Sequence, residues 1–377
     1  MVNKIKFKNF KIFKDWQTLE LRPLTILIGK NNSGKSAVAK LPTLLSGSLS
    51  GTFSTPLKPE NERIKLGLSY EDLVYNRYPA DSLGFEISTE TETINVSLYG
   101  DRSGKVHFSE FSYNKEKKFD LSTTKFKGFV PNKKLFKTLN LEFDYIGPFR
   151  KIPSPYFQNS VHEFDKIGIE GENAYPILIQ NNEEKMFNKI SNWYKINFEG
   201  WGLRVSPISG LVQTYEISLE NIGLKPINIV NVGQGIHQVL PLIVRSYMPT
   251  DKETLIIIEE PETHLHPAAH GNLAQRFAES YLEDNNKSYL LETHSQNFVL
   301  RMRRLVAEKV IKKEDLAIYY VDFDKDKKES SLKFIEIDEN GGIPNNDWPT
   351  GVFNETSLET RAIYNAQLND KQNVDRD

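Results

Sequence analysis

The sequence predicts an α/β fold in which a mixed sheet surrounds a glycine-rich turn, together with an inserted α+β region. Three observations support this prediction. Short apolar segments alternate with helix-like segments near both ends of the chain, which is typical of α/β sheets. A glycine-rich turn at residues 29–36 joins one apolar segment to a helix-like one. The residues between these parts alternate polar and apolar side chains, as half-buried strands do.

The composition limits the class of protein. The chain has 377 residues, of which 38% are hydrophobic, so it can bury a sizeable core in one large domain or two modest ones. It has no cysteine, which excludes disulfides, thiolate-bound zinc, iron–sulfur clusters and a cysteine nucleophile. The net charge of -2 gives no global attraction for DNA, so contact with nucleic acid would need a local basic face.

The apolar runs are too short for a membrane protein. The longest, at residues 24–28 and 255–258, fall far below the roughly 20 residues that span a bilayer. Met1 leads into lysines and a strand-like pattern, and no signal peptide is visible. We therefore expect no membrane partner and a cytoplasmic location, which the lack of cysteine also suits.

The amino-terminal elements lead to the glycine-rich turn. Residues 1–28 predict two or three strands, of which the last, Leu24–Ile28, is buried. Residues 36–45 have helical spacing, although Pro42 lacks an amide proton and should kink or shorten that helix. Residues 46–59 are rich in Ser, Thr, Gly and Pro and predict a mobile loop.

The remaining elements predict a domain that is split along the chain. Later strands are expected at residues 254–258, 288–291 and 316–321, with helices at 236–247 and 296–309 between them. We therefore assign residues 1–55 and 226–355 to one domain. Residues 56–225 form an inserted α+β region that partly completes it, and residues 356–377 form a polar tail that we expect to be disordered.

The glycine-rich turn has the pattern of a phosphate-binding loop. Gly29-Lys30-Asn31-Asn32-Ser33-Gly34-Lys35-Ser36 fits G-x-x-x-x-G-K-[ST] at every fixed position. The strand before it and the helix after it are the context that this motif requires, so an ordinary glycine turn is disfavoured. The glycines would let backbone amides point at phosphate oxygens, with the helix N-terminus adding positive charge. Lys35 would reach the β- and γ-phosphates, and the Ser36 hydroxyl would hold Mg²⁺.

A second motif is an apolar strand that ends in carboxylates, Thr254–Glu262. Because side chains alternate faces along a strand, Glu259 and Glu260 point in different directions and can have different roles. We assign Glu259 to the magnesium shell and Glu260 to the general base for the water that attacks the γ-phosphate. An edge strand running into an acidic loop is the alternative, but three successive branched residues are too apolar for an exposed strand.

Several histidines follow the carboxylates. His266 and His270 are four residues apart, so on a helix they would share a face, as zinc-binding histidines do. The preferred interpretation is that they are polar residues lining a nucleotide interface, because the phosphate-binding loop already explains the neighbouring acids.

Two further segments complete a known order of motifs. Asn231–Gln238 is a second glycine-rich turn that opens a helix, and Leu291–Ser295 places His294 just after a strand. The order of phosphate loop, glycine-rich signature, acidic strand and histidine switch resembles that of ABC-type ATPases. The run Glu259–Pro267 resembles the soluble branch of AAA ATPases related to the OLD, SMC and recombination-repair families. Tyr145–Arg150, and the segment from Gly342 through Trp348 to Phe353, resemble a compact bacterial branch of them.

This resemblance implies an ABC-type ATPase head that binds ATP and Mg²⁺ and forms a head-to-tail homodimer or a higher oligomer. It places Gly233, Gly235 and His237 in a signature that covers the partner's γ-phosphate, His294 at the γ-phosphate switch, and His266 in the segment linking the two sites. His237 departs from the serine usual in related sequences, which makes weak or pH-dependent hydrolysis conceivable. No glutamine can be assigned as the lid residue that contacts magnesium and the attacking water. Glu71, Asp72 and Asn76 lie in the expected stretch but do not decide which residue has this role.

The inserted region is expected to carry the specific function. Residues 115–137 interleave lysines with Phe119, Phe126, Phe129 and Phe136, which suits nucleic acid and equally suits a half-buried strand pair. A second basic cluster, Arg301, Arg303 and Arg304, could face DNA or solvent. Double-stranded DNA is therefore a candidate ligand.

Nuclease activity is not expected in this chain. No Toprim-like acidic set follows the ATPase part, and Asp322 and Asp324 are interpreted as belonging to a hairpin turn at residues 323–328. By analogy with antiphage-defence ATPases of this branch, we expect a regulatory ATPase that controls a separately encoded effector, a nuclease or toxin. An SMC-like DNA-repair ATPase and a nucleotide-dependent scaffold with little hydrolysis are the alternatives.

Overall fold

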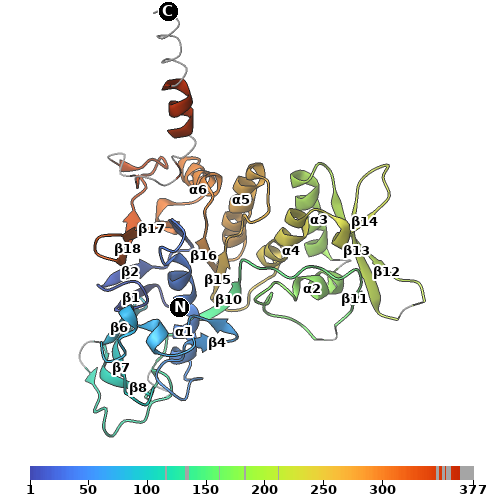
Figure 1. The fold of residues 1–377 in the computed structure, drawn as a ribbon. Helices are drawn as coiled ribbons and strands as arrows, with labels where there is room; N and C mark the ends of the chain where they lie inside the picture. Colours follow the sequence, from blue (N-terminus) through green and yellow to red (C-terminus); the bar gives the residue numbers. More distant parts are fainter. Residues whose placement is uncertain are drawn as a thin grey trace, which may run out of the picture.

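The computed structural model describes residues 1–114, 117–131, 136–160, 162–181, 184–210, 212–344, 348–349, 353 and 358–365. A six-stranded sheet with the order β10-β15-β16-β3-β17-β18 lies at its centre (Figure 1). All neighbours in it are parallel except the β17–β18 hairpin. Its strands are β3 (Leu24–Gly29), β10 (Glu142–Ile146), β15 (Thr254–Glu259), β16 (Lys287–Glu292), β17 (Leu316–Asp324) and β18 (Glu329–Ile335).

The central sheet is buried on both faces. Along β15, Ile256 and Ile258 belong to one hydrophobic core, and Leu255 and Ile257 belong to the other. Helices α4 (Gln234–Tyr247), α5 (Pro267–Glu283) and α6 (Gln296–Ala307) contribute to the first core, and α1 (Lys35–Leu49) contributes to the second. A strand buried on both sides reads as a continuous apolar run, which explains the pattern of residues 254–258.

An antiparallel sheet covers the second core. Its order is β2-β1-β6-β7-β8-β9, and it carries short elements beside it. The strands are β1 (Lys4–Lys8), β2 (Gln17–Glu20), β6 (Leu83–Ser88), β7 (Thr93–Gly100), β8 (Val106–Tyr113) and β9 (Lys117–Lys118); the short elements are β4 (Glu60–Asn61), β5 (Ile64–Lys65), η1 (Glu71–Leu73) and η2 (Tyr75–Arg77).

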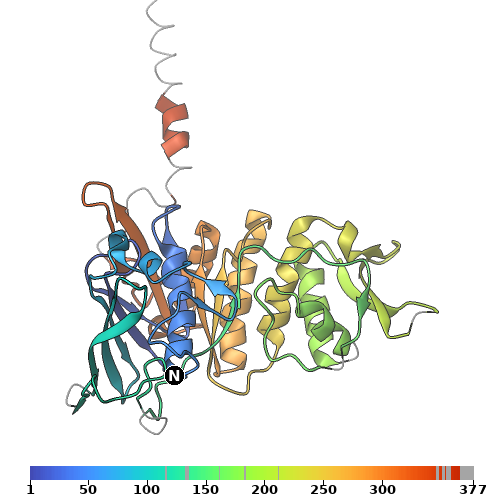
Figure 2. The same ribbon diagram turned by 60° about the horizontal axis from the view of Figure 1, so that its bottom comes forward.

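A third group of elements lies on the other side of the central sheet from β6–β8, as both views show (Figures 1 and 2). It consists of two helices and a small antiparallel sheet in which β13 lies between β11 and β12. Its elements are α2 (Ala174–Gln180), α3 (Lys185–Asn197), β11 (Phe157–Gln158), β12 (Gly202–Pro207), β13 (Thr214–Glu220) and β14 (Ile227–Asn228); η3 (Ile229–Asn231) precedes α4, and η4 (Lys313–Asp315) precedes β17.

The α/β class and mixed sheet predicted from the sequence are confirmed, as is the hairpin turn that follows Asp324. Pro42 was expected to kink or shorten the first helix, and the shortening is wrong, because α1 continues to Leu49. Pro42 is itself buried, so packing offsets the helical hydrogen bond that an amide at this position would have donated to Val38. Residues 56–225 supply β10 to the central sheet and β6–β9 to the antiparallel sheet.

The carboxy-terminal segment differs from the expected tail in one stretch. Residues 358–365 are helical, with Leu358, Ile363 and Tyr364 exposed, and residues 366–377 lie outside the described residues. Across the part of the chain that the structure describes, no helix has both the length and the apolar character needed to cross a membrane.

Candidate functional site

The phosphate-binding loop follows β3 at the carboxyl edge of the central sheet. Gly34 has a φ of 100°, and a Cβ there would lie 2.9 Å from Ile12 Cγ2. Gly29 has a φ of 152°, and a Cβ there would lie 2.5 Å from the Val321 carbonyl oxygen. Both fixed glycines of the motif are therefore required by the backbone conformation and by the close approach of neighbouring elements.

Lys35 and Ser36 begin α1 directly above this loop. Lys35 is 3% exposed, and its Nζ donates to the Lys30 carbonyl oxygen at 2.8 Å. Burial lowers the pKa of Lys35, while the carboxylates of Glu292, Glu260 and Glu262 oppose that shift. Ser36 Oγ donates to Glu292 Oε1 at 2.9 Å. The loop thus places a buried cation and a hydroxyl next to a group of carboxylates.

Two carboxylates end neighbouring strands of the sheet. Glu259 and Glu292 pair in the β15–β16 register, so their side chains lie on the same face. Glu259 Oε1 accepts from the Tyr145 hydroxyl at 2.9 Å and lies 3.2 Å from Lys40 Nζ. Burial raises the pKa of Glu259, and Lys40 opposes the shift.

Glu292 is a site residue that the sequence pattern did not reveal. Its Oε1 accepts from Ser36, whereas its Oε2 has no hydrogen-bond partner among the described residues. Burial, followed by the charge of Glu259, raises the pKa of Glu292 to about 7. Its position in the sequence could have indicated this role. Glu292 is the last residue of the apolar strand before His294, just as Glu259 is the last residue of the apolar strand before Glu260.

Oxygen ligands at this edge suit Mg²⁺. The Ser36 hydroxyl, Glu259 and Glu292 are hard donors, and Mg²⁺ binds proteins through one or two carboxylates together with substrate phosphates. The unpaired Glu292 Oε2 gives this set a ligand atom that makes no protein hydrogen bond. These residues therefore fit the metal that accompanies a nucleotide.

The turn after β15, residues 260–266, is called the carboxylate turn below. Two of its residues, Glu260 and His264, have φ values of 46° and 66°, in the left-handed region. Glu260 Oε2 accepts from the Thr263 hydroxyl at 3.1 Å, and Glu262 Oε1 accepts from the backbone amide of His294 at 2.6 Å. Desolvation, followed by the charge of Lys35, lowers the pKa of His294, with Glu260 opposing. The charges of Glu260 and Lys35 both act on His294, so the three side chains belong to one site.

The other histidines have structural contacts. His266 Nδ1 accepts from the backbone amide of Ala268 at 3.3 Å and caps α5. His270 contacts the Ser295 hydroxyl at 2.7 Å and the Leu265 carbonyl oxygen at 3.1 Å. Within the described ranges, no group of three or more His, Cys, Asp or Glu side chains could hold a metal ion, so the histidine metal alternative gains no support.

The signature turn begins α4. Gly233 and Gln234 are exposed, whereas His237 is 4% exposed and its Nδ1 lacks a partner among the described residues. Burial lowers the pKa of His237. Gly235 lies against the carboxylate turn, because a Cβ there would lie 2.3 Å from the His264 carbonyl oxygen. This turn therefore exposes the backbone of Gly233 and Gln234 to solvent, whereas the His237 imidazole is buried.

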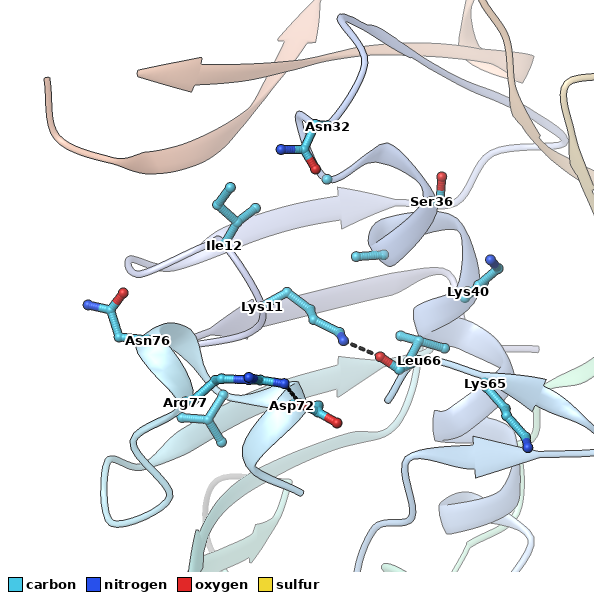
Figure 3. Close-up of a pocket in the computed structure, with 13 residues that line it drawn as sticks. Lys11, Ile12, Asn32, Ser36, Lys40, Lys65, Leu66, Asp72, Asn76 and Arg77 are labelled. Carbon is cyan, nitrogen blue, oxygen red and sulfur yellow. Dashed lines mark hydrogen bonds and ion pairs between the residues drawn. The ribbon is translucent and has the colours of Figure 1, made fainter. Parts of the chain in front are cut away.

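A cavity of about 410 Å³ opens beside the phosphate-binding loop. Figure 3 shows Asn32 and Ser36 on one side of it and Asn76 and Arg77 on the other. Its lining includes four cationic side chains, namely Lys11, Lys40, Lys65 and Arg77, and one acidic side chain, Asp72. An excess of positive charge next to a phosphate-binding loop suits a polyphosphate. Gly233, Gly235 and His237 do not line this cavity.

Two of the lid candidates, Asp72 and Asn76, line the cavity, whereas Glu71 does not. Asp72 has local partners. Its carboxylate accepts from the backbone amides of Leu68 and Ser69 and pairs with Arg77. The backbone amide of Leu68 and then the Arg77 side chain lower the pKa of Asp72 to about 2.

The phenylalanines of residues 115–137 pack against other rings, whereas Lys125, Lys127 and Lys137 are exposed. Phe126 packs against Phe108 and Phe111, with ring centroids 4.4 and 5.0 Å apart, and Phe129 is fully buried. Part of residues 115–137 lies outside the described residues. The three arginines of α6 also have partners: Arg301 donates to Gln275, Arg303 to the Gly341 carbonyl oxygen, and Arg304 to Glu308.

The raised pKa of Glu292 predicts how stability depends on pH. Between about pH 4.5 and 7 the folded protein keeps a proton that the unfolded chain releases, so this group's contribution is full below that range and is lost as pH rises. In EDTA, the unfolding free energy of Glu292→Gln minus that of the parent should increase by up to about 3 kcal/mol as the pH rises from 5 to 8. Urea unfolding measures this. Glu110→Gln, at an exposed position of β8, is the control, and parallel curves for parent and Glu292→Gln would contradict the prediction.

Comparison with known proteins agrees with the fold. Residues 24–301 match the family described as AAA domain, putative AbiEii toxin, Type IV TA system. Residues 311–363 match a family described as a protein of unknown function, DUF3696. No curated protein matches the sequence significantly.

Solved structures of SMC heads share the fold. The chain is similar to an SMC head bound to the C-winged helix domain of ScpA, with 16% identity, a TM-score of 0.51, and coverage of 90% of this chain and 98% of that one. It is also similar to an SMC head with an extended coiled coil bound to the C-terminal domain of ScpA from Pyrococcus furiosus. That match has 13% identity, a TM-score of 0.50, and coverage of 89% of this chain and 96% of that one.

Proposed function

The chain belongs to the AAA-domain family described as putative AbiEii toxin, Type IV TA system, and on that premise we propose that it binds Mg-ATP and hydrolyses it between two copies of itself. The resemblance of the sequence to SMC-related ABC-type ATPases is confirmed by this membership and by the SMC head fold.

The observation that carries the proposal is one edge of the central sheet, where Lys35 and Ser36 meet the carboxylate of Glu292 beside a cationic cavity. Glu259 is the register partner of Glu292 on the neighbouring strand. Backbone amides of residues 29–34 and Lys35 would hold the phosphates, and Ser36, Glu259 and Glu292 would hold Mg²⁺. Bound Mg²⁺ supplies charge neutralisation to the phosphates. Glu260 would accept the proton of the attacking water, and His294 would contact the γ-phosphate.

The dimer is supported by the position of the signature turn. Gly233 and Gln234 are exposed at the N-terminus of α4, and a helix N-terminus favours an anion. The same turn does not line the cavity of its own chain, so we propose that Gly233, Gly235 and the region of His237 cover a nucleotide held by a second copy. The site would then be complete only in a head-to-tail dimer or a larger oligomer.

The biological role proposed is control of a separately encoded effector, a nuclease or toxin, in cytoplasmic antiphage defence. The family description names a toxin of a Type IV TA system, and both similar SMC heads are bound to a domain of ScpA. Both support a partner protein for this chain. Double-stranded DNA stays a proposed trigger, with an SMC-like DNA-repair role as the alternative.

One observation favours a second candidate function, a nucleotide-dependent scaffold with little hydrolysis. The signature position that usually carries serine has His237, whose imidazole is buried rather than presented at the surface. A signature without an exposed donor at this position would stabilise a transition state less. Turnover that stays at background in the parent with and without double-stranded DNA would favour the scaffold, and stimulation by DNA would favour the repair role.

The proposed nucleotide site predicts a specific loss of binding. Lys35→Ala should weaken binding of a fluorescent ATP analogue about 10-fold to 100-fold, because it removes charge-assisted hydrogen bonds to the phosphates. Lys30→Ala is the matched control, since Lys30 belongs to the same loop but its side chain is exposed. Equal losses in both variants would indicate general charge attraction and count against the proposed site.

A further inference from the structure

The segment after β10 contacts the carboxylate turn from inside the protein. Arg150 is 5% exposed, and its Nη2 donates to the backbone carbonyl oxygens of Glu259 and Glu260, both at 2.9 Å. Arg150 Nε and Nη1 have no hydrogen-bond partner among the described residues. A buried cation is costly without hydrogen bonds, so the two carbonyl groups stabilise Arg150 in the protein interior. The same two bonds fix the backbone at the start of the carboxylate turn.

The turn that Arg150 holds has a conformation that needs support. Glu260 and His264 are not glycine, yet both have left-handed φ values. Such residues persist only where the surrounding structure determines their conformation. Arg150 bonds to the carbonyl of Glu260 itself, so it supports the residue that we propose as the general base.

The same segment is bonded to the signature helix. Gln238, in the second turn of α4, is 7% exposed, and its Nε2 donates to the Arg150 carbonyl oxygen at 2.9 Å. A second contact runs in parallel, because Gly235 lies against the His264 carbonyl oxygen so closely that no Cβ fits between them. The start of α4 therefore contacts the carboxylate turn directly and through Arg150.

We propose that Arg150 is a positioning residue that sets the conformation of the carboxylate turn and, through Gln238, couples it to the signature turn of the same chain. Building on the proposed function, a partner's nucleotide that engages the signature turn of one chain would adjust Glu260 in that chain. The two nucleotide sites of a dimer would thereby act on each other through each protomer. Arg150 touches no substrate in this account and acts only through the turn.

The test combines turnover with hydrogen exchange. Arg150→Met should lower kcat about 10-fold to 100-fold, as loss of a supporting partner does, while the affinity for an ATP analogue stays within about twofold of the parent. Backbone amides of residues 259–266 should exchange faster in this variant, and Arg150→Lys should restore part of both properties. In Gln238→Leu, a non-hydrolysable ATP analogue should still protect the phosphate-binding loop but should no longer protect residues 259–266.

Arg303→Met is the matched control, since Arg303 also donates to a backbone carbonyl, that of Gly341, away from the carboxylate turn. It should leave kcat and exchange of residues 259–266 at parent values. Arg150→Met with parent exchange in the turn, or with affinity falling in step with kcat, would overturn the positioning role. Continued protection of the turn in Gln238→Leu would overturn the coupling. Exchange needs no turnover, so if the parent fails to hydrolyse ATP, which would refute the proposed function, the exchange of residues 259–266 in Arg150→Met and Gln238→Leu still decides this inference.

Discussion

Glu260→Gln is expected to lower ATP turnover by about 100-fold or more while leaving ATP binding close to the parent value. A general base contributes roughly 10²-fold to 10⁴-fold, and the amide cannot accept the proton of the attacking water. The change keeps the shape of the side chain and an oxygen that can accept from the Thr263 hydroxyl, so the carboxylate turn should keep its conformation. Turnover under saturating ATP and Mg²⁺, together with analogue binding, measures both parts.

The same variant tests the dimer. If hydrolysis separates the two copies, Glu260→Gln with ATP and Mg²⁺ should accumulate particles of twice the monomer mass or more, as measured by light scattering. Glu110→Gln, at an exposed position of β8, should behave as the parent. Undiminished turnover in Glu260→Gln would mean that another group, such as Glu292, accepts the proton. A mass that stays monomeric would count against the dimer.

Arg245→Met is expected to lower the free energy of unfolding by about 3–5 kcal/mol. Arg245 Nε donates to Asp144 Oδ2 at 2.6 Å, and both side chains are 2% exposed, so the pair is fully enclosed between β10 and α4. Removing one partner leaves a buried charge without compensation, which is far more costly than the pair is stabilising. Urea unfolding followed by circular dichroism measures the loss.

The double variant Asp144→Leu/Arg245→Met separates charge from packing. An apolar pair of similar volume avoids the buried charge, so it should recover most of the stability that the single change loses. A double variant as unstable as Arg245→Met would show instead that the hydrogen bonds of this pair to Ile167 and Thr250 dominate.

The sequence was most informative where a residue's role follows from local pattern. The apolar strand before Gly29, the branched residues before Glu259 and the glycines of the phosphate-binding loop all lie where the pattern predicts. Each of these signals is contained within about ten neighbouring residues. The fold class and the position of the loop could therefore be predicted without any long-range information.

Residues whose roles depend on distant neighbours were missed or misjudged. Glu292 and Arg150 gain their roles from strand register and from a backbone turn more than 100 positions away, respectively. Residues 115–137 were ambiguous because lysines and phenylalanines alternate both in a strand with one buried face and in a surface that binds nucleic-acid bases. Pro42 was misjudged because burial of α1 stabilises a helix whose local propensity is poor.

The position of β10 also limits how recombination can alter this domain during evolution. Residues 56–225 look dispensable to a nucleotide-binding core, yet they contain the edge strand β10, Tyr145 against Glu259, and Arg150 against the carboxylate turn. Recombination that exchanges this whole region between relatives would remove part of the catalytic edge along with the variable elements. A viable chimera has to retain residues 142–151, so specificity can diversify on either side of that segment but not through it.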